Sequence, residues 1–248
     1  EDELLRRVLA SYPDKKIAVV AIDPSKKKTG GALLGDRIRM NSLDPDRVYM
    51  RSIATRGSMS VLPGSITAIL DILSAAAFDL VLIETPGIGQ GDVRITEFAD
   101  YSIYVMTSDY GAPSQLEKID MLDFADLIVI NKFDHRNSMD ALRDVRKQYR
   151  RNSADFATPD EELPVLGTMA NNYYDPGLDI FFRRVVAGMS SRGIIDWNGP
   201  GASGREERPG FSYHIIPDER VGYLAEIART VRDYHEETCL LYTSDAAD

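Results

Sequence analysis

The sequence predicts an α/β fold, in which a doubly wound, mostly parallel β-sheet carries helices on both faces. Three observations lead to this prediction: short apolar segments rich in β-branched residues, polar residues only at the ends of those segments, and helical patterns between them. Such continuous apolar segments are typical of strands that are buried on both faces of a parallel sheet. Their alternation with helices indicates parallel pairing through helical crossovers.

Strands are expected at residues 17–22, 48–52, 79–84, 102–107, 127–130 and 164–168. The segment 48–52 has the weakest pattern, which favours an edge of the sheet. Helices are expected at residues 1–12, 65–77, 114–124, 138–151 and 178–189, and a further helix of roughly twenty residues is expected to open at about residue 216. Ligands of such folds bind at the carboxyl ends of the strands, so the polar residues there are the first candidates for a site.

The composition excludes several classes of protein. The net charge of −10 argues against a general nucleic-acid binder, because that function needs clustered positive charge. A single cysteine excludes an internal disulfide framework and a cysteine-based zinc site, and fits a reducing cytoplasm. No segment of about eighteen uncharged apolar residues occurs, and the acidic start is unlike a signal peptide, so no membrane partner is expected.

The sharpest motif is Asn131-Lys132-Phe133-Asp134, directly after the predicted strand 127–130. It matches the N-K-x-D motif of GTP-binding proteins. The carboxylate of Asp134 can accept two hydrogen bonds from the guanine ring N–H and exocyclic amine, a pattern that adenine does not offer. Asn131 would support the base edge, and the stem of Lys132 would pack along the ring. The alternative is a surface loop that is rich in turn-forming residues.

A second motif, ETPGIGQ at residues 84–90, follows the predicted strand 79–84. The carboxylate of Glu84 would hold Mg²⁺ directly or through water, and Gly87 lets the backbone place an N–H against a γ-phosphate. Gln90 is a candidate for orienting the attacking water. The alternatives are a solvated strand end for Glu84 and an ordinary surface glutamine for Gln90.

The segment between Asp23 and Met40 adds two more acids near these candidates. Asp23 closes the predicted strand 17–22, and Asp36 follows a glycine-bearing turn. Together with Glu84 they form a candidate Mg²⁺ site, since carboxylate oxygens suit this ion. The three lysines at residues 26–28 would steer a triphosphate toward the cleft, or form a solvated surface run.

One expected motif does not occur in the printed sequence. A nucleoside triphosphatase of this fold needs a GxxxxGK loop ending in Ser or Thr, and the sequence contains no Gly-Lys dipeptide. That loop normally precedes the helix with which this sequence starts. We therefore expect the phosphate-binding loop and the first strand to lie before Glu1.

Longer sequence segments resemble a known family. DPSKKKTGGALLGDRIRM, ETPGIGQGD, APSQLEKIDMLDFAD, INKFD and DALRDVRKQYRRN resemble the GTPase chaperones of cobalamin-dependent acyl-CoA mutases. The likeness is greatest to the fused form, in which chaperone and mutase share one polypeptide and the mutase interconverts isobutyryl-CoA and n-butyryl-CoA. A stand-alone chaperone of methylmalonyl-CoA mutase is the alternative within the family.

The resemblance implies a P-loop GTPase of the SIMIBI class that binds GTP or GDP with Mg²⁺. It places Asp23, Asp36 and Glu84 in the magnesium and switch region. It gives Asn131, Lys132 and Asp134 the selection of guanine, and the segment Thr168-Met169-Ala170 a further contact with the base. Hydrolysis would gate the loading of adenosylcobalamin into mutase domains, the parent protein would be a homodimer, and its location would be cytoplasmic.

The resemblance also suggests a domain organisation: a GTPase domain at residues 1–192, a linker and the start of a helical linker domain at 193–238, and a non-native tail at 239–248. The tail resembles translated adapter sequence. Two readings outside this family remain. One is a GTPase for nickel delivery, which would need Cys and His ligands near the switch regions, and none occurs there. The other is an interaction module that kept the fold without binding nucleotide.

Overall fold

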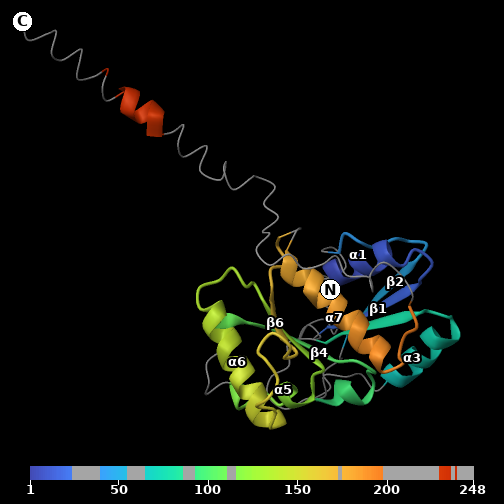
Figure 1. Ribbon diagram of the computed structural model, residues 1–248. Coiled ribbons are helices and arrows are strands. Elements are labelled where there is room, and N and C mark those ends of the chain that lie inside the picture. The colour runs from blue at the N-terminus through green and yellow to red at the C-terminus, as the bar shows by residue number, and fades with distance from the viewer. Residues whose placement is uncertain are drawn as a thin grey trace, which may run out of the picture. The chain divides into compact units, whose positions relative to one another are not determined.

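The computed structural model describes residues 1–23, 40–54, 65–85, 93–110, 116–172, 175–197, 229–235 and 238. The chain divides into two units, residues 1–207 and 208–248. In the first unit strands and helices alternate along the chain (Figure 1). The strands are β1 (Ile17–Asp23), β2 (Val48–Ala54), β3 (Leu80–Glu84), β4 (Ile103–Thr107), β5 (Leu127–Asn131) and β6 (Val165–Thr168). The helices are α1 (Asp2–Ser11), α3 (Ile66–Ala75), α5 (Met121–Phe124), α6 (Ser138–Ser153) and α7 (Pro176–Ser191), and short 3₁₀ turns are η1 (Arg94–Glu97) and η2 (Ser108–Tyr110).

The described strands form two three-stranded sheets with the orders β2-β1-β3 and β4-β5-β6. All four pairings are parallel, which confirms the predicted α/β class. The weakest predicted strand, β2, lies at an edge as expected. In the first sheet Ala21 pairs with Glu84, and in the second Asn131 pairs with both Thr107 and Thr168. The polar ends of neighbouring strands therefore fall at the same edge of each sheet.

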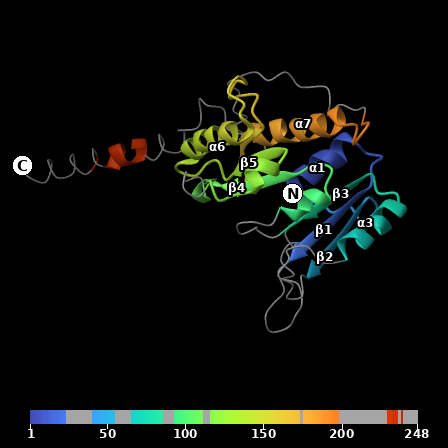
Figure 2. The ribbon, with the colours of Figure 1, turned by 90° about the horizontal axis from the view of Figure 1, so that it is seen from below.

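The strands β1 and β5 are apolar up to their last residue because both of their faces are covered. On β1, residues 17, 19 and 21 pack with α1 and α7, whereas residues 18, 20 and 22 pack with α3. On β5, residues 127 and 129 join the first of these clusters, whereas residues 128 and 130 pack with α5 and α6. Figure 2 shows α1 and α7 on one side of β1 and α3 on the other. Side chains of both sheets thus meet in the core beneath α7.

The segment 114–124 was expected to form one helix, and this prediction is wrong for its described part. The α5 helix covers only Met121–Phe124, and a turn precedes it, in which Leu116 accepts a hydrogen bond from the N–H of Ile119. Leu116, Met121 and Leu122 are all buried. In one straight helix these positions would point in different directions, so the break lets all three reach the same core.

The strands β3 and β4 are less covered than β1, β5 and β6. Among the described strands, β3 pairs only with β1 and β4 only with β5. Residues of β3 are half-buried or exposed, and Val105 on β4 is 57% exposed. By contrast, Ile128 and Ile130 on β5 are fully buried. Each of these two strands therefore leaves one edge without a described partner.

In the second unit, residues 229–235 are helical and exposed, within the helix expected to open at about residue 216. Across the described residues, none of the helices combines the length and the apolar character that crossing a membrane requires.

Candidate functional site

The site is built where β5 and β6 end side by side. Asn131, the last residue of β5, accepts a hydrogen bond through Oδ1 from the backbone N–H of Ala170, at 3.2 Å. The same oxygen accepts a hydrogen bond from Oγ1 of Thr168, at 3.3 Å. Thr168 is buried, with 3% of its surface exposed. One amide group therefore joins the turn after β5 to the turn after β6.

The backbone of the Asn131–Asp134 turn is fixed by further bonds. The N–H of Phe133 donates to the carbonyl of Thr168 at 3.0 Å, and the N–H of His135 donates to the carbonyl of Lys132 at 2.9 Å. Lys132 has a φ of 56°, in the left-handed region that tight turns require. The side chains of Lys132 and Asp134 are exposed. The turn thus holds its backbone rigidly and presents an ammonium and a carboxylate to solvent.

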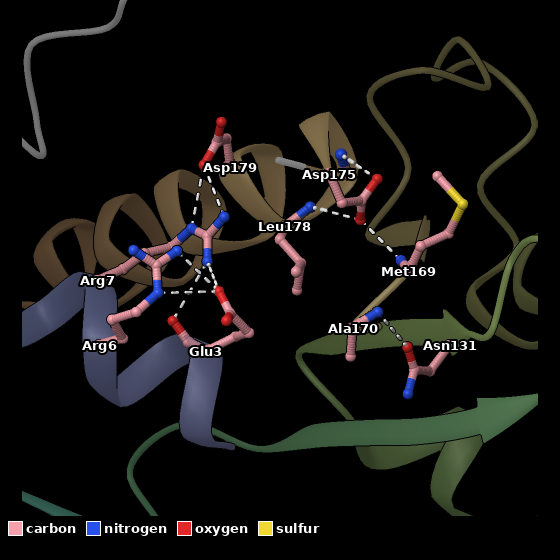
Figure 3. A network of polar contacts seen from close by, with 10 residues as sticks. Glu3, Arg6, Arg7, Asn131, Met169, Ala170, Asp175, Leu178 and Asp179 are labelled. Atoms are coloured by element: carbon pink, nitrogen blue, oxygen red, sulfur yellow. Dashed lines mark hydrogen bonds and ion pairs between the residues drawn. The ribbon is translucent and has the colours of Figure 1, made fainter. Parts of the chain in front are cut away.

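Asp175 secures the β6 turn from the other side. Its carboxylate accepts hydrogen bonds from the N–H groups of Met169 at 2.7 Å, Leu178 at 3.1 Å and Gly177 at 3.2 Å (Figure 3). Asp175 is the N-cap of α7 and is only 3% exposed. Sequence reasoning missed this residue, because it began the helix at residue 178. The signal was present in Asp175-Pro176, since an acidic cap before a proline in the first turn marks a helix start.

The other candidates belong to the first sheet or lie outside the described residues. Asp23 ends β1, two residues beyond Ala21, which pairs with Glu84 at the end of the neighbouring β3. Glu84 is exposed. Asp36, Gly87 and Gln90 lie outside the described residues, as does the side chain of Asp23. Within the part of the chain that the structure describes, no group of three acids, histidines or cysteines could hold a metal, so the Mg²⁺ site stays a prediction.

The structure therefore brings together one part of the predicted site. Hydrogen bonds join four residues at the ends of β5 and β6: Asn131, Phe133, Thr168 and Ala170. Met169 lies between Thr168 and Ala170 and bonds to Asp175. Asp134 joins them through its Oδ2 atom, which accepts a hydrogen bond from Nδ2 of Asn171 at 3.5 Å. Together they form an open edge that combines exposed charge with fixed backbone.

Several curated relatives cover nearly the whole chain. The fused isobutyryl-CoA mutase of Geobacillus kaustophilus is 52% identical over 236 residues, which are 94% of this chain and 21% of that protein. The enzyme of the same name from Paraburkholderia xenovorans is 49% identical over 241 residues, covering 95% of this chain and 19% of that protein. The chain thus spans about a fifth of the length of these relatives.

Solved structures give the fold. HypB from Helicobacter pylori, in complex with nickel, has a TM-score of 0.53 at 16% identity, covering 79% of this chain and 84% of that one. HypB from Archaeoglobus fulgidus has a TM-score of 0.50 at 15% identity, with the same coverage. These values show a shared α/β architecture alone. The family model "Methylmalonyl Co-A mutase-associated GTPase MeaB" matches residues 5–185, so the chain belongs to this GTPase family.

Proposed function

We propose that this chain binds GTP and GDP and hydrolyses GTP, as the chaperone domain of a cobalamin-dependent acyl-CoA mutase. The observation that carries the proposal is the bond between Asn131 and Ala170, which places the Asn-Lys-x-Asp turn beside residues 168–170. Membership of a GTPase family supports it independently.

Guanine recognition follows from the chemistry of the exposed edge. The carboxylate of Asp134 accepts the ring N–H and the exocyclic amine of guanine, whereas adenine offers no matching pair of donors. The stem of Lys132 packs along the ring, and the backbone of residues 168–170 contacts the base. Asn131 acts by holding the two turns together. Asp134 therefore selects the base, and its neighbours set the position of the base.

We assign the phosphate end of the nucleotide to three acids, two of which end strands of the first sheet. We propose that Asp23 and Glu84, at the ends of neighbouring strands, hold Mg²⁺ together with Asp36, because carboxylate oxygens suit this ion and Glu84 is exposed. The ion would neutralise charge that develops on the transferred phosphoryl group. Gly87 would donate its N–H to the γ-phosphate, and Gln90 would orient the attacking water.

The partner is proposed from the relatives. The relatives that cover nearly the whole chain bear the name fused isobutyryl-CoA mutase, so we propose mutase domains of the same polypeptide that interconvert isobutyryl-CoA and n-butyryl-CoA. GTP hydrolysis would gate loading and protection of adenosylcobalamin, which the mutase domains bind. The parent would be a cytoplasmic homodimer. A stand-alone chaperone of methylmalonyl-CoA mutase is the second candidate, favoured by the description of the matching family.

The test is nucleotide selectivity of the full-length protein. Fluorescent GDP is titrated with Mg²⁺ present, and unlabelled GDP, GTP, ADP and ATP compete for the site. The proposal requires displacement by both guanine nucleotides and none by adenine nucleotides at equal concentration. Binding of neither class would favour an interaction module, and equal displacement by ADP would exclude the role given to Asp134.

A further inference from the structure

Asp175 makes more contacts than a helix cap needs. A capping side chain has to satisfy one or two of the free N–H groups in the first turn of a helix. Asp175 does this for Gly177 through Oδ1 and for Leu178 through Oδ2. Its Oδ2 atom also accepts a hydrogen bond from the N–H of Met169, a residue outside the helix. At 2.7 Å this bond is the shortest of the three. The carboxylate therefore ties the β6 turn to α7.

The β6 turn is held residue by residue by two side chains. Thr168 and Ala170 bond to the amide oxygen of Asn131, and Met169 between them bonds to Asp175. Figure 3 shows Asn131 and Asp175 approaching the turn from different elements, β5 and α7. Because three consecutive residues have a partner, the turn is ordered before any ligand arrives.

The first turn of α7, which follows Asp175, is held in place by a contact with α1. Asp179, one turn further along α7, accepts a hydrogen bond from Nε of Arg7 on α1, at 3.0 Å. Arg7 is 8% exposed and also pairs with Glu3. A buried arginine that bridges two helices fixes the start of α7 relative to α1. The position of Asp175 is therefore fixed together with the start of α7.

We infer that Asp175 is a positioning residue for guanine recognition, which fixes the Met169 N–H and with it the 168–170 turn against the base. The inference rests on the proposed function. A turn that is ordered in advance loses less conformational entropy when the nucleotide binds, so the affinity rises without a new contact to the ligand.

Two substitutions separate capping from positioning in the full-length protein. Asp175→Ser keeps a good cap for α7 but is too short to reach Met169 as well. Asp175→Asn keeps one side-chain oxygen that can accept from both Met169 and Leu178, as Oδ2 does, and loses only the acceptor for Gly177. The control is Asp140→Ser, a change of the same type in the first turn of α6, where Asp140 pairs with Arg143 at the surface.

The affinity for fluorescent GDP should fall about tenfold in Asp175→Ser, because the 168–170 turn then has to be ordered when the nucleotide binds. It should stay within about threefold of wild type in Asp175→Asn and in the control. The urea midpoint of Asp175→Ser should fall, because the Met169 N–H loses its acceptor, so GDP is titrated without urea, where every variant is folded. Equal affinity of the serine and asparagine variants would overturn the inference. Failure of wild type to bind GDP would overturn the proposed function instead.

A measurement on the wild-type protein needs no variant. The Met169 amide is bonded in the absence of nucleotide, so its hydrogen exchange should be at least about tenfold slower than that of an open turn amide. Rapid exchange that becomes slow only after GDP is added would show that the nucleotide orders the turn. That result would overturn the inference even if Asp175→Ser failed to fold.

Discussion

The backbone of Gly177 in α7 lies directly against the carbonyl oxygen of Gly167 in β6. A methyl group added to Gly177 would sit 2.3 Å from that oxygen, which is far inside van der Waals contact. At Gly167, an added methyl group would in turn meet the ring of Phe133 at 2.4 Å. The β6 strand and the start of α7 are therefore packed at a distance that only glycine permits at residue 177, whereas a side chain at residue 167 would require the Phe133 ring to move.

Gly177→Ala should destabilise the protein. The obstacle is backbone, which cannot swing away, so helix and strand must separate at a cost of about 1–3 kcal/mol. The measurement is the free energy of unfolding in urea. Ala187→Ser, at an exposed position of the same helix, serves as control and should change the value by less than about 0.5 kcal/mol. Unchanged stability of Gly177→Ala would mean that β6 and α7 are less closely packed than the structure has them.

Asp134→Asn should weaken GDP binding by about tenfold to a hundredfold, because one acceptor oxygen becomes a donor that opposes the donors of guanine. Xanthine presents a carbonyl where guanine carries its amine, so xanthosine diphosphate should bind the variant better than GDP does. Competition titrations of full-length wild type and variant measure both changes. Asp140→Asn, at a surface ion pair, is the matched control. A uniform loss of both nucleotides would argue that Asp134 supports the turn without reading the base.

The strands were readable from sequence because each is a continuous apolar segment. The segment 127–130 predicted β5, and its buried side chains on both faces explain why. The Asn131–Asp134 motif was readable for a related reason, since the chemistry of guanine demands these residue types at this spacing. Such local signals need no knowledge of distant contacts.

Asp175 and the break before α5 were missed for a different reason. Asp175 matters through Met169, whose N–H reaches it only after β6 and α7 have packed together. The break between Leu116 and Met121 depends on a core that other segments complete. Both features are decided by tertiary contacts, and helical periodicity along the chain does not contain them.

Glu3 should make stability depend on acid pH. Burial alone raises the pKa of Glu3, but hydrogen bonds from Arg6 and Arg7 outweigh it and lower the pKa below the ordinary 4.5. Below about pH 4.5 the unfolded chain therefore binds the proton that the folded chain still excludes, and stability falls as the pH drops. Urea unfolding between about pH 7 and pH 3.5 measures this dependence.

Glu3→Gln should flatten that dependence and lower stability at neutral pH, since Arg7 then remains buried with a weaker partner. Glu162→Gln changes an exposed carboxyl and should keep the wild-type pH profile. If both variants follow the same profile, Glu3 does not contribute to the acid sensitivity.

The open edge of β4 and its exposed Val105 should make the 248-residue chain prone to association. Val105 is 57% exposed on a strand that, among the described residues, pairs only with β5. An open strand edge with apolar side chains is a template for pairing with another molecule. Val105→Lys should therefore slow the growth of light scattering in a concentrated solution. Ile72→Lys removes an apolar side chain of comparable exposure, 67%, from the helix α3 and should have less effect. Equal protection by both variants would assign the association to apolar surface in general, since only Val105 lies on a strand edge.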